Sequence, residues 1–308
     1  MADIHFPTPS IEGPLIPVYS PKPDVYHSRS TERLTQGETY ERWKPNDFTI
    51  IKDDRGVYHL IGITHPCPDD FIDAYHYNPE TLHQSSWQLF HATASAERFS
   101  DLLYADSFEQ QAQILPSTER PGESEEIWAP YVIRKGQEYL LYYTPNAFRY
   151  ASSPDLYQWT PRGELFRDGP MARDVQIFVD DDGLAYLTYL DENTVYTRTS
   201  RDLIHWSDRR VLQQNPFLGG MSESPFLFKR KGVYYLLWCL CDGRNGSYDT
   251  RSFLFAGHTL EELARTAPIT MLKIHAPEVW EENGAYYILG TFFPKNGVNA
   301  ARLRFDDE

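Results

Sequence analysis

The chain has 308 residues, of which 15% are aromatic, a content that suits pleated strands and sugar-stacking surfaces. Its formal charge of −15 and its pI near 5.1 argue against nucleic acid and anionic membrane surfaces as partners. No basic segment followed by an apolar run opens the chain, and no run of eighteen apolar residues occurs, so we expect a cytoplasmic protein. Cys67, Cys239 and Cys241 are too few for a zinc site or a disulfide framework and are predicted to be buried free thiols.

A hairpin pattern recurs along the chain. It consists of an apolar strand, a turn with glycine and charged residues, and a strand centred on tyrosine. The five copies begin at Thr49, Tyr131, Val175, Pro225 and Glu278. Their turns read DRG, RKG, DDG, RKG and ENG, and each glycine suits the left-handed position of a tight turn. The pattern predicts five β-hairpins of one type.

A third strand is indicated after several of these hairpins. It is carried by HATASAERFSDLL from His91, YASSPDLYQWTP from Tyr150 and TRTSRDLIHWSD from Thr197. The last two share an Asp-Leu-x-x-Trp element, in which the aspartate is predicted to bond to the turn backbone and the tryptophan to cover the blade edge. Helical periodicity is confined to Thr259–Ala264 and Ala96–Leu103.

Five copies of a three- or four-stranded sheet arranged radially make a β-propeller, in which terminal repeats are expected to be irregular. We therefore predict an all-β, five-bladed β-propeller that forms a single domain over residues 1–308. The alternative is an all-β sandwich built from similar hairpins.

Candidate catalytic residues fall at one offset within the repeat. Counting back eleven or twelve positions from the central tyrosine of each hairpin gives Asp47, Trp128, Asp174, Glu223 and His275. Because the first strand of every blade lines the channel of a propeller, these side chains are predicted to converge on one pocket. Each carboxylate alone could cap a strand or pair with an arginine, but three at one offset favour a functional site.

Two carboxyl groups that flank a glycosidic bond are the standard device for sugar hydrolysis. One protonates the leaving oxygen, and the other activates water or attacks directly. We assign Glu223 as the acid and Asp47 as the base. Asp174 is assigned to tuning, because a third acid nearby raises the pKa of the general acid and can accept sugar hydroxyl bonds. The expected partner is an oligosaccharide, and the sequence specifies no oligomeric state.

Five further residues are predicted to bind substrate, namely Asn46, Trp128, Arg173, Ser222 and His275. Trp128 suits a sugar platform or the channel wall. Arg173 could clamp a hydroxyl or lower the pKa of Asp174, although adjacent strand residues normally point to opposite faces. His275 could contact substrate, hold a calcium ion through ordered water, or be a rim histidine. The sequence shows no metal site of its own, because VDDDG at Val179 is expected to be a solvated hairpin turn.

Three segments resemble the blade motifs of glycoside hydrolase family 43, whose propeller is shared with families 32, 68, 117 and 130. They are IWAPYVIRKGQEYLLYY, ARDVQIFVDDDGLAYL and MSESPFLFKRKGVYYLLW. The resemblance implies Asp47 as base, Asp174 as pKa modulator and Glu223 as acid. It also implies inversion at arabinofuranosides or xylosides, no required cofactor, and in some members a structural calcium ion in the channel. Ser224 stands where the family usually has glycine, and Val175 where it usually has proline.

Other functions remain as alternatives. PNDF at Pro45 and ARDV at Ala172 also resemble the Asn-Asp and Arg-Asp motifs of the retaining fructosidases in glycoside hydrolase family 32, but Glu223 is followed by Ser-Pro rather than by their cysteine. A glycoside phosphorylase needs Arg, Lys or His clustered beside the acids to hold phosphate, and the equivalent positions show no clear cluster. A non-catalytic carbohydrate-binding propeller should have lost one of the three acids.

Overall fold

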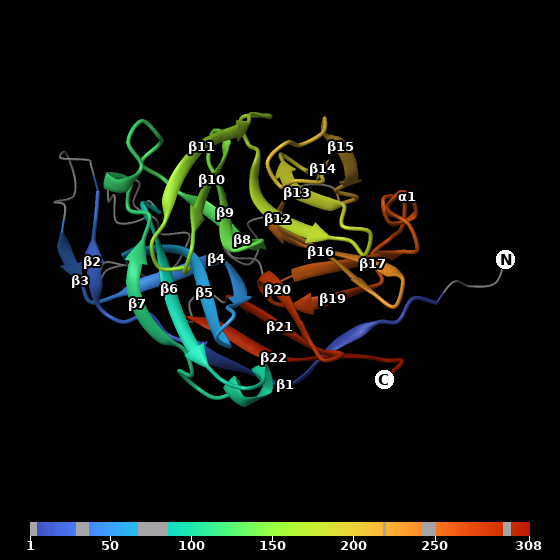
Figure 1. Ribbon diagram of the computed structural model, residues 1–308. Helices are drawn as coiled ribbons and strands as arrows, with labels where there is room; N and C mark the ends of the chain where they lie inside the picture. The colour runs from blue at the N-terminus through green and yellow to red at the C-terminus, as the bar shows by residue number, and fades with distance from the viewer. Residues whose placement is uncertain (1–4, 29–36, 67–85, 218–219, 242–250, 292–296) are drawn as a thin grey trace.

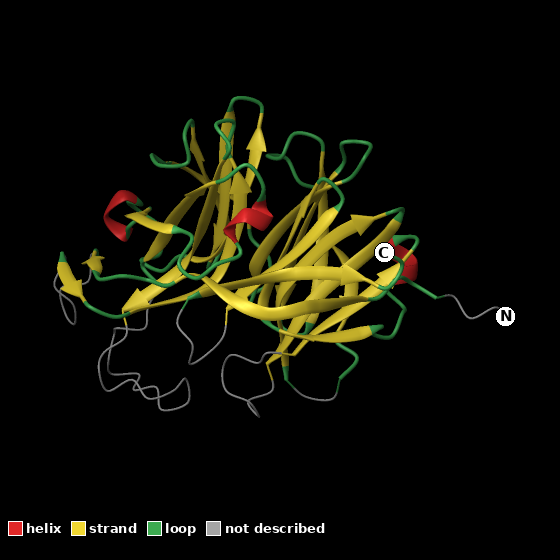
Figure 2. Ribbon diagram, turned by 90° about the horizontal axis from the view of Figure 1, so that it is seen from below, coloured by secondary structure: helices red, strands yellow, loops and turns green. Residues whose placement is uncertain are grey.

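Five four-stranded antiparallel sheets surround a common axis and form a five-bladed β-propeller, as predicted (Figure 1). A computed structural model describes residues 5–28, 37–66, 86–217, 220–241, 251–291 and 297–308. The short helical segments lie at the periphery, outside the sheets (Figure 2).

The strands follow the chain from blade to blade. The first blade holds β4 (Trp43–Lys52), β5 (Val57–Pro66), β6 (Gln88–Ser95) and β7 (Glu109–Ile114), and the second β8 (Trp128–Lys135), β9 (Glu138–Thr144), β10 (Phe148–Ser153) and β11 (Thr160–Phe166). The third holds β12 (Arg173–Val179), β13 (Ala185–Asp191), β14 (Thr194–Ser200) and β15 (Arg210–Gln214), and the fourth β16 (Met221–Arg230), β17 (Val233–Cys241), β18 (Arg251–Gly257) and β19 (Thr270–Lys273). The fifth holds β20 (His275–Glu282), β21 (Ala285–Thr291), β22 (Val298–Phe305) and β1 (Pro9–Tyr19), and β2 (Asp24–Tyr26) pairs with β3 (Glu38–Tyr40) outside the blades.

The fifth blade is completed by the N-terminal strand. β1 pairs antiparallel with β22, from Pro9 opposite Phe305 to Tyr19 opposite Val298, and the two run side by side in Figure 1. Val18 is fully buried in the core between the fifth and first blades. The sequence predicted an irregular terminal repeat but not this closure of the ring by its two ends.

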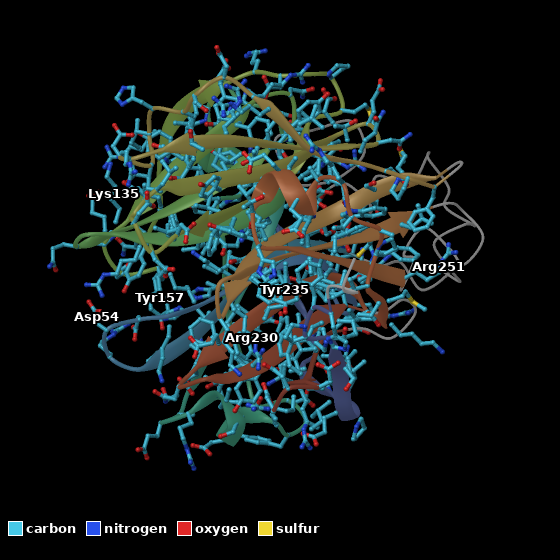
Figure 3. All side chains as sticks on the ribbon, turned by 90° about the vertical axis from the view of Figure 1, so that its right-hand side faces the viewer. Asp54, Lys135, Tyr157, Arg230, Tyr235 and Arg251 are labelled. Carbon is cyan, nitrogen blue, oxygen red and sulfur yellow. The ribbon has the colours of Figure 1, made fainter. Side chains whose placement is uncertain are left out.

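Side chains where the fourth blade meets the chain ends strengthen the closure (Figure 3). The guanidinium of Arg230 lies 4.1 Å from the ring centroid of Phe305 and 2.7 Å from the carboxylate of Asp307. The Tyr235 hydroxyl donates to the carbonyl of Pro7 at 2.9 Å. Both termini are therefore bound to the fourth blade as well as to each other.

The Asp-Leu-x-x-Trp turns form as predicted. Asp155 Oδ1 accepts the backbone N–H groups of Tyr157 and Gln158, both at 2.9 Å, and Asp202 accepts two equivalent bonds at 2.9 and 2.8 Å. Trp159 is buried, and its indole N–H donates to the carbonyl of Leu156 at 3.1 Å. These side-chain bonds fix the turn before the outer strand.

The helical predictions are confirmed as single turns. α1 (Leu260–Leu263) is capped by Thr259, and the 3-10 turn η2 covers Phe99–Leu102; a second such turn, η3, covers Ser117–Glu119. None of the helices in the described ranges is long and apolar enough to cross a membrane. Cys239 is buried and free, whereas Cys67 and the side chain of Cys241 lie outside what the structure describes.

Candidate active site

A β-bulge interrupts the first strand of every blade at the same place. The register with the second strand shifts between Pro45 and Phe48, Trp128 and Tyr131, Arg173 and Gln176, Glu223 and Phe226, and His275 and Glu278. At four of these bulges the backbone adopts a left-handed conformation, with φ of 39° at Ala129, 60° at Asp174, 50° at Ser224 and 47° at Ala276. A bulge re-aims side chains, so consecutive residues can face the same side.

The bulges correct the predicted offset. By register, Trp128, Glu223 and His275 are equivalent, but Asp174 lies one position later and Asp47 two positions later. The prediction that all five occupy one equivalent position was therefore wrong. The three acids nevertheless converge, because each bulge brings more than one residue toward the channel mouth.

One pocket brings the three predicted acids together. It has a volume of about 200 Å³ and is lined by Asn46, Asp47, Ile63, Ser86, Trp128, Arg173, Asp174 and Glu223. Six of the eight were predicted as catalytic or substrate-binding residues. The acids come from three strands, β4, β12 and β16, so the pocket exists only in the closed ring.

Arg173 lies between two of the acids. Its guanidinium is 3.6 Å from the carboxylate of Asp174 and 3.6 Å from that of Glu223, and it also donates to the carbonyl of Ser222 at 3.3 Å. The predicted influence of Arg173 on the pKa of Asp174 is confirmed, because the bulge turns both side chains into the site although strict strand alternation would place them on opposite faces. Burial would lower the pKa of Arg173, but the neighbouring carboxylates outweigh it and hold that pKa above its usual value, so the guanidinium is charged.

The surroundings of the three acids give them different pKa values. Burial raises the pKa of Glu223 to about 8, and the charge of Asp174 adds to the effect. Burial raises the pKa of Asp174 to about 6 against the opposing charge of Arg173. Burial also raises the pKa of Asp47, while a hydrogen bond from Ser224 opposes that rise. At neutral pH Glu223 is thus a protonated acid that can donate a proton, whereas Asp174 is mainly ionised.

Sequence reasoning missed Ser224 and Glu278 as site residues. The Ser224 backbone N–H donates to Asp174 Oδ2 at 3.0 Å, and its hydroxyl donates to Asp47 Oδ1. Glu278 is 8% exposed and lines a water-sized cavity with Gln176 and Ser224, among others; this cavity adjoins the pocket, since Asp47 and Asp174 line both. Burial and the charge of Asp47 raise the pKa of Glu278 well above its ordinary value. The one sequence signal for Glu278 was its place at the start of the fifth hairpin copy.

Two predicted substrate-binding residues lie behind the pocket wall. His275 is 1% exposed, and its Nε2 lies 3.2 Å from Asn46 Oδ1, so it orients that asparagine. The side chain of Ser222 is fully buried, and its carbonyl holds Arg173. Neither side chain lines the pocket, and both residues support side chains that do, so their predicted contact with substrate stays a prediction.

The sequence offered His275 as a residue that could hold a calcium ion through ordered water. Within the described part of the chain, no group of three or more His, Cys, Asp or Glu side chains could hold a metal ion. His275, the candidate ligand, is engaged with Asn46. A calcium ion held through ordered water stays a prediction.

Comparisons with known proteins concern the family and the fold. Residues 105–253 match the family model for glycosyl hydrolases family 43, and no curated protein sequence matches the chain. An exo-1,5-α-L-arabinanase from a bovine ruminal metagenomic library is 15% identical, with a TM-score of 0.60 over 85% of this chain and 93% of that one. An endo-arabinase from Bacteroides thetaiotaomicron is 14% identical, with a TM-score of 0.61 over 91% and 96%. A compost-metagenome β-xylosidase/α-arabinofuranosidase is 16% identical, with a TM-score of 0.58 over 92% and 94%.

The protein is therefore a glycoside hydrolase built on a five-bladed propeller. Its resemblance to glycoside hydrolase family 43 is confirmed by the match to the family model, which runs from the last strand of the first blade through the second and third blades to the third strand of the fourth.

Proposed function

We propose that the protein is an inverting glycoside hydrolase that removes terminal arabinofuranosyl or xylosyl residues from short oligosaccharides. Glu223 is the general acid, Asp47 the general base, and Asp174 the residue that tunes them. One observation carries the proposal: the three carboxyl groups line one pocket, and in it Glu223 has a pKa of about 8. A carboxylic acid that is still protonated at neutral pH is what leaving-group protonation requires.

The reaction takes place in one displacement. Glu223 gives its proton to the glycosidic oxygen, and the bond from that oxygen to the anomeric carbon breaks with its electron pair going to the leaving oxygen. A water molecule attacks the opposite face of the anomeric carbon while Asp47 takes one of its protons. The released sugar has the opposite anomeric configuration. Arg173 stays charged beside Asp174 and Glu223 and fixes their orientation.

The substrate class is supported by the pocket and by the neighbours. About 200 Å³ is less than the ~300–1,000 Å³ typical of sites for drug-sized ligands, which favours a single terminal sugar ring. Trp128 offers that ring an apolar surface at the wall. The solved structures include an arabinanase and a β-xylosidase/α-arabinofuranosidase, which are named for arabinose- and xylose-containing substrates.

The test is hydrolysis of nitrophenyl glycosides (arabinofuranoside, xyloside, galactoside and a fructoside mimic) by the wild type, Glu223→Ala and Asp47→Asn. We expect turnover of the arabinofuranoside or xyloside that collapses in both variants. Proton NMR of the first product formed should show the inverted anomer, and added phosphate should not be consumed. Retention of configuration would favour a fructosidase-like mechanism. Activity that neither substitution affects, or no activity on any glycoside, would overturn the assignment of the acids.

A further inference from the structure

Ser224 connects three blades at the mouth of the channel. It lies on β16 of the fourth blade, its backbone N–H binds Asp174 of the third blade at 3.0 Å, and its hydroxyl binds Asp47 of the first blade. The next residue toward the N-terminus is Glu223. A single residue thus contacts two of the three acids through its own donors and is covalently joined to the third.

The backbone of Ser224 is in a conformation that a side chain makes costly. Its φ is 50°, in the left-handed region that glycine adopts more readily than any other residue. Glycine would relieve the strain and keep the N–H bond to Asp174, but it would lose the hydroxyl. Strain kept at a site where the side chain makes a specific bond points to a role for that bond.

We propose that Ser224 is a positioning residue whose hydroxyl keeps Asp47 ionised and oriented as the general base. The inference rests on the proposed function and deepens it. A hydroxyl that donates to a carboxylate stabilises the charged form, whereas burial acts in the opposite direction. The hydroxyl fixes Oδ1 of Asp47 and thereby the plane of the carboxylate that is to accept the proton of the attacking water.

The test is the pH dependence of kcat/KM for Ser224→Ala and Ser224→Gly, measured on the best wild-type substrate. The base must be ionised, so its titration sets the acidic limb of the profile. Loss of the hydroxyl should move that limb to higher pH by about one to two units, which is about a 10- to 100-fold loss of rate below the limb. The alkaline limb, set by Glu223, should move much less.

Two variants and a control separate this role from backbone strain. Both substitutions remove the hydroxyl, so both should shift the acidic limb. Only glycine relieves the strain of the positive φ, so Ser224→Gly should melt at a temperature at least as high as that of Ser224→Ala. Ala129→Gly relaxes the equivalent bulge position in the second blade, where φ is 39°, and should leave the limb in place. A limb that shifts equally in all three variants would overturn the proposal.

A second readout does not depend on catalysis. Titration of aspartate labelled with carbon-13 at the carboxyl group, assigned with Asp47→Asn, reports the protonation of Asp47 in the whole chain by NMR. Its midpoint should rise in both Ser224 variants. If the wild type proves inactive, the proposed function fails, but this titration still decides the role of Ser224. An unchanged midpoint in both variants would overturn the inference even if the enzyme is active.

Discussion

The burial and the pKa of Glu278 depend on residues that the closed ring brings together from different blades. It is almost fully buried beside the pocket, and burial together with the charge of Asp47 raises its pKa well above the ordinary value. Folding therefore favours its protonated form. The stability that this form provides is complete below pH ~4.5 and is lost as pH rises toward the folded pKa, because the unfolded chain then releases the proton more readily.

We predict that Glu278→Gln, which keeps the size and removes the titration, gains stability relative to the wild type as pH rises. The difference in unfolding free energy should grow by about 1.4 kcal/mol per pH unit above pH ~4.5. Urea unfolding between pH 4.5 and 7 measures it. Glu281→Gln, exposed on the same strand, is the matched control and should show only a small, flat difference. A difference for Glu278→Gln that does not change with pH would contradict the account.

At the residue scale, the sequence identified the acids but not their supports. Asp47, Asp174 and Glu223 could be found because each stands beside a repeated hairpin and in a motif resembling a known family. Ser224 contacts Asp47 across 177 positions of sequence, and Glu278 belongs to a different blade from Asp47 and Asp174, so no local pattern reports either contact. For the same reason no local pattern showed that the side chains of His275 and Ser222 do not line the pocket.

At the level of elements, β1 closes the ring by pairing with β22 in the fifth blade. Its inward-facing Val18 is fully buried against the first and fifth blades, whereas Glu12 on the same strand is exposed and paired with Arg304. In a propeller whose ends meet in one sheet, a weakened closing strand exposes the edge of β22.

We predict that Val18→Ala lowers the free energy of unfolding by about 2 kcal/mol, since it removes packed methyl groups from a fully buried position. Glu12→Ala should change it by less than about 0.5 kcal/mol, because exposed ion pairs contribute little. Denaturant unfolding of both variants provides the comparison. Equal effects would mean that β1 is not part of the cooperative core.

The first strand of each blade shows where a prediction from strict two-residue alternation fails. Strict alternation predicts that Arg173 and Asp174 lie on opposite faces, but the bulge inserts a residue and turns both toward the pocket. Counting positions along the chain was therefore off by one residue at Asp174 and by two at Asp47. The hairpins themselves were predictable, because their glycine turns and tyrosine-centred strands are local.

For the whole molecule, the five-fold repeat was sufficient to predict the ring and the pocket at its axis. We expect the choice of sugar to depend instead on long connections, of which residues 67–85 and 242–250 lie outside the described ranges. Loops on a rigid scaffold carry selectivity, and their conformation is not encoded in a repeated pattern.

The most direct test of the central claim is the dependence of kcat on the leaving group. Glu223→Ala and Asp47→Asn should be compared on a dinitrophenyl glycoside and on a disaccharide of the same sugar. If Glu223 is the acid, Glu223→Ala should keep most of the wild-type kcat on the dinitrophenyl substrate, whose leaving group needs no proton, and lose about 10²- to 10⁴-fold on the disaccharide. Asp47→Asn should lose activity on both. An equal loss on both substrates in Glu223→Ala would contradict the account.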